Sequence, residues 1–195
     1  MPFFSDSGFQ PKRAFRFLVT FSQLGDLTFM VKTAKKPSYK METKSHQILN
    51  HQFNFPGIIK WEPLDVTFID AVDPNVGSRF YSTLIGSGYV PPTNHEGLLT
   101  GITKAGTTAT IGEVRIKQLD GGGAILAPGA DPNNVDAQPS MILEEWTLKN
   151  AFITSVKFGD QLGYDKEDLI NVTVSLTYDF ATYEPYPNGK AYKAG

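Results

Sequence analysis

The sequence contains no cysteine. Disulfide bonds, thiolate catalysis and cysteine-ligated zinc or iron–sulfur centres are therefore excluded. No apolar run approaches the roughly 20 residues that are needed to span a bilayer. The first residues also lack the basic and apolar regions of a secretory signal. We therefore expect a soluble, unprocessed protein.

Charged residues are scarce as well: they make up 19% of the 195 residues, and the formal net charge is −2. The molecule as a whole is therefore not a nucleic-acid-binding polycation. The charge is segregated, however, because residues 1–60 hold nine Lys or Arg against three acids, and residues 61–195 hold nine against seventeen. Unlike faces on identical copies attract, which favours head-to-tail self-association. Mixing of the two halves on folding is the alternative.

Apolar residues are plentiful, at 41% hydrophobic and 12% aromatic, enough for a core. Alternation of apolar and polar positions predicts strands, at 14–22, 27–32, 61–70, 110–119, 141–149, 151–158 and 170–180. The first two are expected to form a hairpin around Gly25–Asp26. This pattern predicts a mainly β protein, an antiparallel β-sandwich or barrel.

One flanking helix is predicted at about 73–86. Asp73 is a suitable N-cap, Pro74 suits the first helical position, and Val76, Phe80 and Leu84 recur every four residues. We expect one domain over residues 1–195, with terminal arms at 1–13 and 184–195. The Gly-, Thr- and Pro-rich region of about 87–140 is expected to be a loop insertion around the strand at 110–119.

The segment 38–55 has an extended composition, but neither of its faces is apolar enough to cover a core. Its two sides alternate Lys40, Glu42, Lys44 and His46 with Tyr39, Met41, Thr43, Ser45 and Gln47. Pro56–Gly57 is expected to turn the chain back. A ribbon that is wet on both sides buries little surface to offset its ordering entropy, so we expect it to pair with another molecule.

The strand at 170–180 shows the strictest alternation in the sequence. Its outer face is polar with almost no charge, and consists of Asn171, Thr173, Ser175, Thr177 and Asp179. Such a face suits the wall of a water-filled lumen, as in a barrel that several copies close together. Closure would also cover the strand edges, which are otherwise aggregation hazards.

No catalytic or metal-binding motif is evident. His46 and His51 flank a predicted bend, but only Glu42 lies near enough to be a third metal ligand, so solvated side chains are the favoured interpretation. Glu144 and Glu145 are neighbours on a strand and are expected to point to opposite faces, which prevents them from sharing a proton. We therefore expect no enzyme activity, no cofactor and no metal.

Several segments, taken in order, resemble the tail tube proteins of contractile-tailed (T-even-like) bacteriophages. They are Phe15–Phe21 (FRFLVTF), Phe29–Ala34 (FMVKTA) with Pro37, Trp61 with Leu64–Phe68 (LDVTF), Trp146–Phe152 (WTLKNAF), and the closing strand Ile170–Asp179 (INVTVSLTYD). The likeness covers residues 14–85 and 141–184. It implies a β-sandwich with a helix and six copies per ring, with a continuous inner β-barrel. The rings would stack into a tube inside the contractile sheath.

The resemblance also implies partners and a location. The partners would be further copies of the chain, the sheath and baseplate proteins, and viral DNA as transient cargo in the lumen. The location would be the virion tail, assembled in the host cytoplasm. The fold would be shared with the tube of type VI secretion systems, and the segment 38–57 would match the family's long hairpin that lines the lumen and touches the neighbouring ring.

The resemblance and the residues together give a set of candidate lumen or inter-subunit residues: Lys40, Glu42, Lys44, His46, His51, Asn171, Thr173, Ser175, Thr177 and Asp179. A basic lumen would retard DNA through phosphate contacts. We therefore predict that Lys40 and Lys44 pair across an interface, with the Asn171–Asp179 face or the acids of 120–145. The alternatives are a single-ring baseplate or tail-terminator protein, and a monomeric β-barrel that binds a small ligand.

Overall fold

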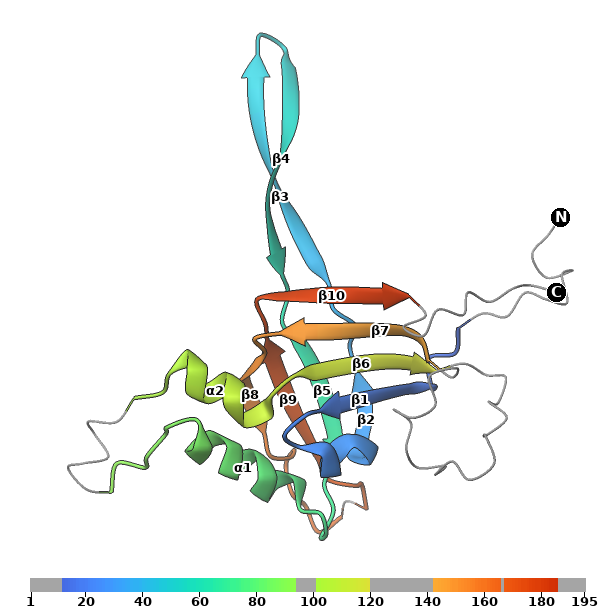
Figure 1. Ribbon diagram of the computed structural model, residues 1–195, viewed down its shortest axis with the longest axis vertical. Coiled ribbons are helices and arrows are strands. Elements are labelled where there is room, and N and C mark those ends of the chain that lie inside the picture. Colours follow the sequence, from blue (N-terminus) through green and yellow to red (C-terminus); the bar gives the residue numbers. More distant parts are fainter. Residues whose placement is uncertain (1–11, 94–100, 120–141, 166, 186–195) are drawn as a thin grey trace, which may run out of the picture.

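The computed structural model describes residues 12–93, 101–119, 142–165 and 167–185 (Figure 1). In these ranges the strands form two four-stranded sheets and a two-stranded hairpin, and all of the pairings are antiparallel. Sheet A has the order β1 (Phe17–Phe21), β6 (Val114–Leu119), β7 (Ile142–Lys149) and β10 (Phe180–Pro185). Sheet B has the order β2 (Val31–Ala34), β5 (Leu64–Ile69), β9 (Asn171–Thr177) and β8 (Phe152–Lys157). The predicted antiparallel, mainly β class is confirmed.

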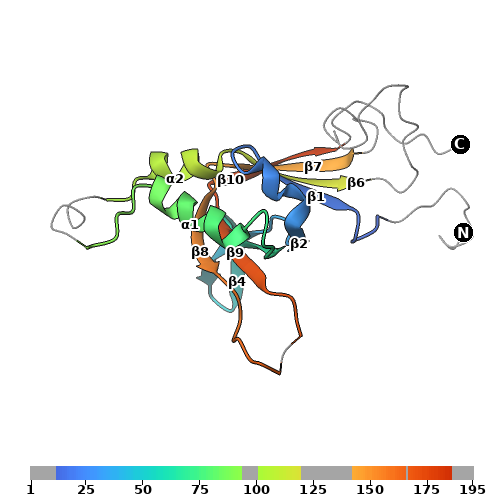
Figure 2. The same cartoon turned by 90° about the horizontal axis from the view of Figure 1, so that it is seen from below.

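The two sheets pack face to face around one hydrophobic core. Sheet B supplies alternate residues of β5 and β9, and sheet A supplies residues of β1, β6 and β7. Phe68 of β5 lies at the centre, with its ring 5.9 Å from Phe21 of β1 and 5.0 Å from Phe80 of a helix. Figure 2 shows the helices α1 (Val76–Gly86) and α2 (Lys104–Ile111) side by side at one end of the sandwich.

A long hairpin projects from this body (Figure 1). It consists of β3 (Tyr39–Ile48) and β4 (His51–Trp61). At its base, the Glu62 N–H donates to the carbonyl oxygen of Ser38 at 2.9 Å. The Trp61 ring contacts Tyr39 edge-on and Tyr178 at a tilt, with centroid distances of 5.5 and 5.8 Å. Among the described residues, these contacts anchor the hairpin at its base. Among the described residues, no helix combines the length and apolar character that crossing a membrane would require.

The predicted strand at 27–32 is wrong for its first part. Gly25–Met30 form the 3₁₀ helix η2, and β2 starts only at Val31. The three-residue spacing of Leu24 and Leu27, both buried, suits a 3₁₀ helix, in which positions i and i+3 share a side. Because β1 and β2 lie in different sheets, they do not form the predicted hairpin.

The helix predicted at 73–86 is present, but it starts at Val76, and its N-cap is Asn75 rather than Asp73. The Asn75 side chain accepts from the Ser78 N–H at 2.6 Å, while Leu84, expected in the core, is partly exposed. A second helix, α2, lies where a loop and the start of a strand were predicted. It is capped by the Thr103 hydroxyl, and its threonines donate to preceding carbonyls, a composition with low helix propensity.

The predicted strand at 170–180 ends earlier than its alternation suggests. Strand β9 stops at Thr177, and the chain then crosses to sheet A, where Phe180 starts β10. The predicted C-terminal arm therefore begins later, because Glu184 and Pro185 belong to β10. Of the other arm and of the 87–140 insertion, residues 1–11, 94–100 and 120–140 lie outside the described residues.

Candidate functional site

The hairpin is exposed along its whole length, as expected for a ribbon with no core of its own. All ten residues of β3 are exposed, and in β4 only Gly57 and Trp61 are partly covered. The two strands satisfy each other's hydrogen bonds from Tyr39–Trp61 to Ile48–His51. The turn therefore lies at Leu49–Asn50, which confirms the predicted bend between His46 and His51, and the predicted turn at Pro56–Gly57 is wrong. The two-sided exposure itself is confirmed.

Pro56–Gly57 instead lie at a bulge, where the register shifts between Met41 and Thr43. Glycine is required there because a Cβ at position 57 would lie 2.8 Å from the carbonyl oxygen of Glu42. A bulge increases the local twist of a strand pair and re-aims the side chains beyond it. It divides the hairpin into a base half, nearer the body, and a tip half, which comprises residues 43–56.

The two halves carry apolar side chains on opposite faces. Residues paired across an antiparallel ladder share a face. At the base, one face is apolar, with Tyr39, Met41, Ile59 and Trp61, and the other is charged, with Lys40, Glu42 and Lys60. In the tip half, the first face becomes polar and uncharged. The second face becomes apolar and basic, and consists of Lys44, His46, Ile48, His51, Phe53 and Phe55.

Lys40 has an ion-pair partner in its own chain. Its ammonium lies 2.5 Å from the Glu62 carboxylate of the same chain, and Lys60 lies 2.5 Å from Glu42. The hydrogen bond to Glu62 raises the pKa of Lys40, and the bond from Lys40, helped by Ser38, lowers the pKa of Glu62. Within its own chain Lys40 is therefore paired, whereas the pairing of Lys40 and Lys44 across an interface stays a prediction, since residues 120–141 lie outside the described residues. Lys44 has no ion-pair partner in the described part of its own chain.

The polar outer face of sheet B is confirmed for four of the five predicted residues. Asn171, Thr173, Ser175 and Thr177 alternate with buried residues of β9 and stay half-buried. Ser175 donates to Asp65 at 2.7 Å, and Lys32 donates to Asn171 at 3.1 Å. This face also carries Lys35 and Lys157.

Asp65 is the carboxylate at the centre of that face. The hydrogen bond from Lys35, followed by that from Ser175, lowers the pKa of Asp65. Asp179, the fifth predicted residue, does not belong to the face. It lies in the crossing from β9 to β10, where it accepts from Lys104 and Asn150 at 2.7 Å. Lys104 lowers the pKa of Asp179. Asp179 was expected on the polar face because the predicted strand runs to residue 180, whereas β9 ends at Thr177.

Both edges of sheet B lack a second partner strand within the described residues. Strand β2 pairs only with β5, and strand β8 pairs only with β9. Such edges present unpaired backbone N–H and C=O groups that can pair with another chain. Sheet B therefore has one polar face and two open edges.

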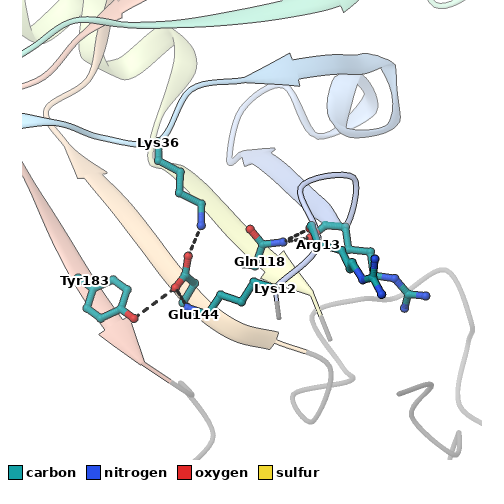
Figure 3. A network of polar contacts seen from close by, with 7 residues as sticks. Lys12, Arg13, Lys36, Gln118, Glu144 and Tyr183 are labelled. Carbon is teal, nitrogen blue, oxygen red and sulfur yellow. Dashed lines mark hydrogen bonds and ion pairs between the residues drawn. The ribbon is translucent and has the colours of Figure 1, made fainter. Parts of the chain in front are cut away.

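The connection between sheet B and the hairpin is fixed by a buried carboxylate. Glu144 of β7 is 5% exposed and binds Lys36 of that connection, Lys12 of the N-terminal region and the Tyr183 hydroxyl (Figure 3). Burial alone would raise the pKa of Glu144, but the hydrogen bonds from the two lysines outweigh it, so that this pKa is lowered. Glu145 binds Arg115 on the other face of β7, as predicted for strand neighbours.

The lowered pKa of Glu144 predicts that its contacts with Lys12 and Lys36 stabilise the fold less at acidic pH. A depressed carboxyl pKa contributes stability above the unfolded value of about 4.3, and this stability is lost as the pH falls through the folded pKa. Glu144→Gln is expected to cost about 1–2 kcal/mol at pH 7 and much less at pH 3. Urea denaturation at both pH values measures this. Glu184→Gln, an exposed glutamate of β10, is the control, and an equal cost of Glu144→Gln at both pH values would contradict the assignment.

His46 and His51 share the apolar, basic face of the tip half, and both are exposed. Across the described ranges, no group of three or more histidine, aspartate or glutamate side chains could hold a metal ion.

No protein-family model matches the sequence, and a search of curated proteins finds no match. Solved structures do match. The chain superposes on a component of the anti-feeding prophage baseplate with a TM-score of 0.60 at 14% identity, covering 91% of this chain and 98% of that one. It superposes on the tube-terminating cap of the same particle with 0.57 at 16% identity, covering 91% and 93%. A component of the sheath–tube complex of an extracellular contractile injection system (PVC) gives 0.56 at 14% identity, covering 90% and 92%. The chain therefore has a tail-tube-like fold.

Proposed function

We propose that this protein is a structural, non-enzymatic tube subunit of a contractile tail, which assembles into six-membered rings that stack into a tube. The observation that carries the proposal is the hairpin, which is exposed over its whole length in a chain with a tail-tube-like fold. An exposed ribbon with apolar patches on both faces needs neighbours to bury them. The two open edges of sheet B support ring closure, because pairing β8 of one copy with β2 of the next removes both edges.

In this arrangement the polar face of sheet B lines the lumen, and sheet A faces outward, towards a sheath. On the outer face of sheet A, Arg115 of β6 is exposed, which suits a polar contact. We propose DNA as the cargo of the lumen. Of the three lysines on the lumen face, Lys32 and Lys35 are held by Asn171 and Asp65, which limits their adhesion to phosphate.

Electron microscopy and light scattering of the purified full-length protein test this proposal. We expect rings near six times the 21.5 kDa of one chain, and tubes at higher concentration. Tubes favour the repeating subunit, whereas rings that never stack favour a baseplate or terminator protein, a second candidate supported by the similarity to a cap and a baseplate component. A monomer at all concentrations would overturn both. It would favour a ligand-binding module, which requires an enclosed apolar cavity.

A further inference from the structure

We propose that Phe29 of one copy fills the pocket between α1, α2 and β8 of the neighbouring copy in the same ring, an inference that rests on the proposed tube function. Phe29 then supplies a side-chain contact at the place where β8 of one copy pairs with β2 of the next. The partner is a second copy of this chain. The size and lining of the pocket, the exposure of Phe29 and the register of sheet B support this assignment.

The pocket has a volume of about 210 Å³ and includes residues of β8, the open edge strand of sheet B. Its apolar lining comes from the two helices and from the end of β8, and consists of Phe80, Leu84, Ile153, Val156 and Phe158. The other described lining residues are threonines and serines, so filling the pocket removes no described charge from water. An apolar cavity of about 150 Å³ is large enough to bind benzene. The pocket can therefore hold one aromatic ring.

Apolar side chains are exposed on both sides of the proposed contact. Phe29 lies in η2, two residues before β2, and is 70% exposed, whereas Leu27 of the same helix is completely buried. At the pocket, Leu84 is 38% exposed and Phe158 is 51% exposed. Burial of such side chains against another molecule is favourable, because it removes apolar surface from water. Docking of Phe29 in the pocket covers all three side chains.

The register of sheet B places Phe29 and the pocket at the same end of the sheet. One row of paired residues crosses all four strands, from Thr33 of β2 through Thr67 and Thr173 to Lys157 of β8. Phe158 follows Lys157 beyond this row, and Phe29 precedes Thr33 on the same side of the row. Because β2 and β8 run in opposite directions, the end of β8 meets the start of β2 when these strands pair between copies.

The two halves of the contact lie on opposite sides of the body. In both views α2 and the C-terminal end of α1 lie on one side, and β2 lies on the other (Figure 1, Figure 2). Such a head-to-tail contact closes a ring if each copy meets the next at the same height. β2 has four residues and β8 has six, and backbone pairing between such short strands leaves their register weakly specified. A ring seated in a pocket fixes that register.

Substitutions on both sides of the contact test it in the full-length protein. Phe29→Asp, and separately Leu84→Asp, are each expected to lower the fraction of chains in rings about tenfold or more, because either places a charge in an apolar contact. Phe29→Leu keeps the side chain apolar and should hold the ring fraction within about threefold of wild type. Sedimentation velocity measures the rings. In protein diluted until it is monomeric, the variants should unfold like the wild type, since Phe29 is exposed there.

Tyr164→Asp and Ile85→Asp are the matched controls and should leave the ring fraction unchanged. Tyr164 is an exposed aromatic residue of the β8–β9 loop, and Ile85 follows Leu84 in α1 with a similar exposure of 40% but is not among the described lining residues of the pocket. Equal loss of rings in the controls would overturn the proposal, because the effect would then not be specific to the pocket.

Photo-crosslinking locates the contact directly. The substitution Phe29→p-benzoylphenylalanine keeps an aromatic side chain, and its crosslinks are expected on residues 80–87, 107–110 or 153–158 of a second copy, identified by mass spectrometry. Crosslinks confined to other segments, or rings that survive both Phe29→Asp and Leu84→Asp, would overturn the docking of Phe29 and leave the tube function standing. A wild-type protein that forms no rings would instead overturn the proposed function.

Discussion

Replacing Phe68 with alanine is expected to lower the free energy of unfolding by about 3–5 kcal/mol. Phe68 is completely buried in β5, and its ring contacts Phe21 of sheet A and Phe80 of α1. One side chain therefore joins both sheets and a helix. Its truncation leaves a cavity that closes only if three separate elements move. The loss of unfolding free energy is therefore expected to be among the largest for large-to-small substitutions.

Urea denaturation followed by tryptophan fluorescence at one fixed protein concentration measures this loss, because assembly makes stability concentration-dependent. The matched control is Phe29→Ala in η2, where the side chain is 70% exposed and the expected cost is below about 1 kcal/mol. With a total stability of about 5–15 kcal/mol, the Phe68 variant should be visibly less stable and the control should not. Equal losses for both variants would contradict the central position of Phe68.

The strands of the sandwich could be predicted because alternation is a local property. In β9, each apolar residue from Val172 to Leu176 is completely buried, and each polar neighbour stays on the outer face. The break between β7 and β8 could also be predicted, since Asn150 there adopts φ of 54°, which asparagine tolerates better than most residues. The burial of every second residue on one face is therefore enough to predict these strands.

The elements that could not be predicted depend on contacts distant in sequence. The segment Leu27–Val31 alternates like a strand, but Leu24 and Leu27 both enter the core, and this favours the 3₁₀ helix. Helix α2 has few good helix formers, and its position against α1 and β8 is a tertiary feature. The alternation of β9 continues into Phe180, yet the partner strand changes after Thr177. Pairing between strands decides where this strand ends.

In the candidate site, too, the features set by local sequence could be predicted and those set by distant contacts could not. Exposure of both hairpin faces could be predicted from composition, and so could the polar residues of β9. The bend between His46 and His51 could be predicted as well, but the second turn predicted at Pro56–Gly57 removes Glu62 from the register of Lys40. With a single turn at Leu49–Asn50, Lys40 lies close to Glu62. The change of apolar face at the bulge follows from the same register, so it too requires the structure.

The hairpin gives the prediction with the largest effect on assembly. Replacing residues 41–59 with Asn-Gly, a two-residue turn suited to hairpins, is expected to abolish tubes entirely. The base contacts stay intact in this variant, namely the edge-on contact of Tyr39 with Trp61 and the hydrogen bond from Glu62 to Ser38. Because the removed residues are almost all exposed, the stability of the body should change by no more than about 0.5–1 kcal/mol.

Thermal denaturation and electron microscopy of the same preparation separate the two effects. We expect a melting temperature close to that of the wild type together with complete loss of stacked tubes, since the long exposed hairpin that projects from the body is gone. A body that unfolds on removal of the hairpin would show that the ribbon serves its own subunit. Tubes of normal length would place the stacking contacts on the sandwich itself, because a dispensable ribbon could not be what joins one ring to the next.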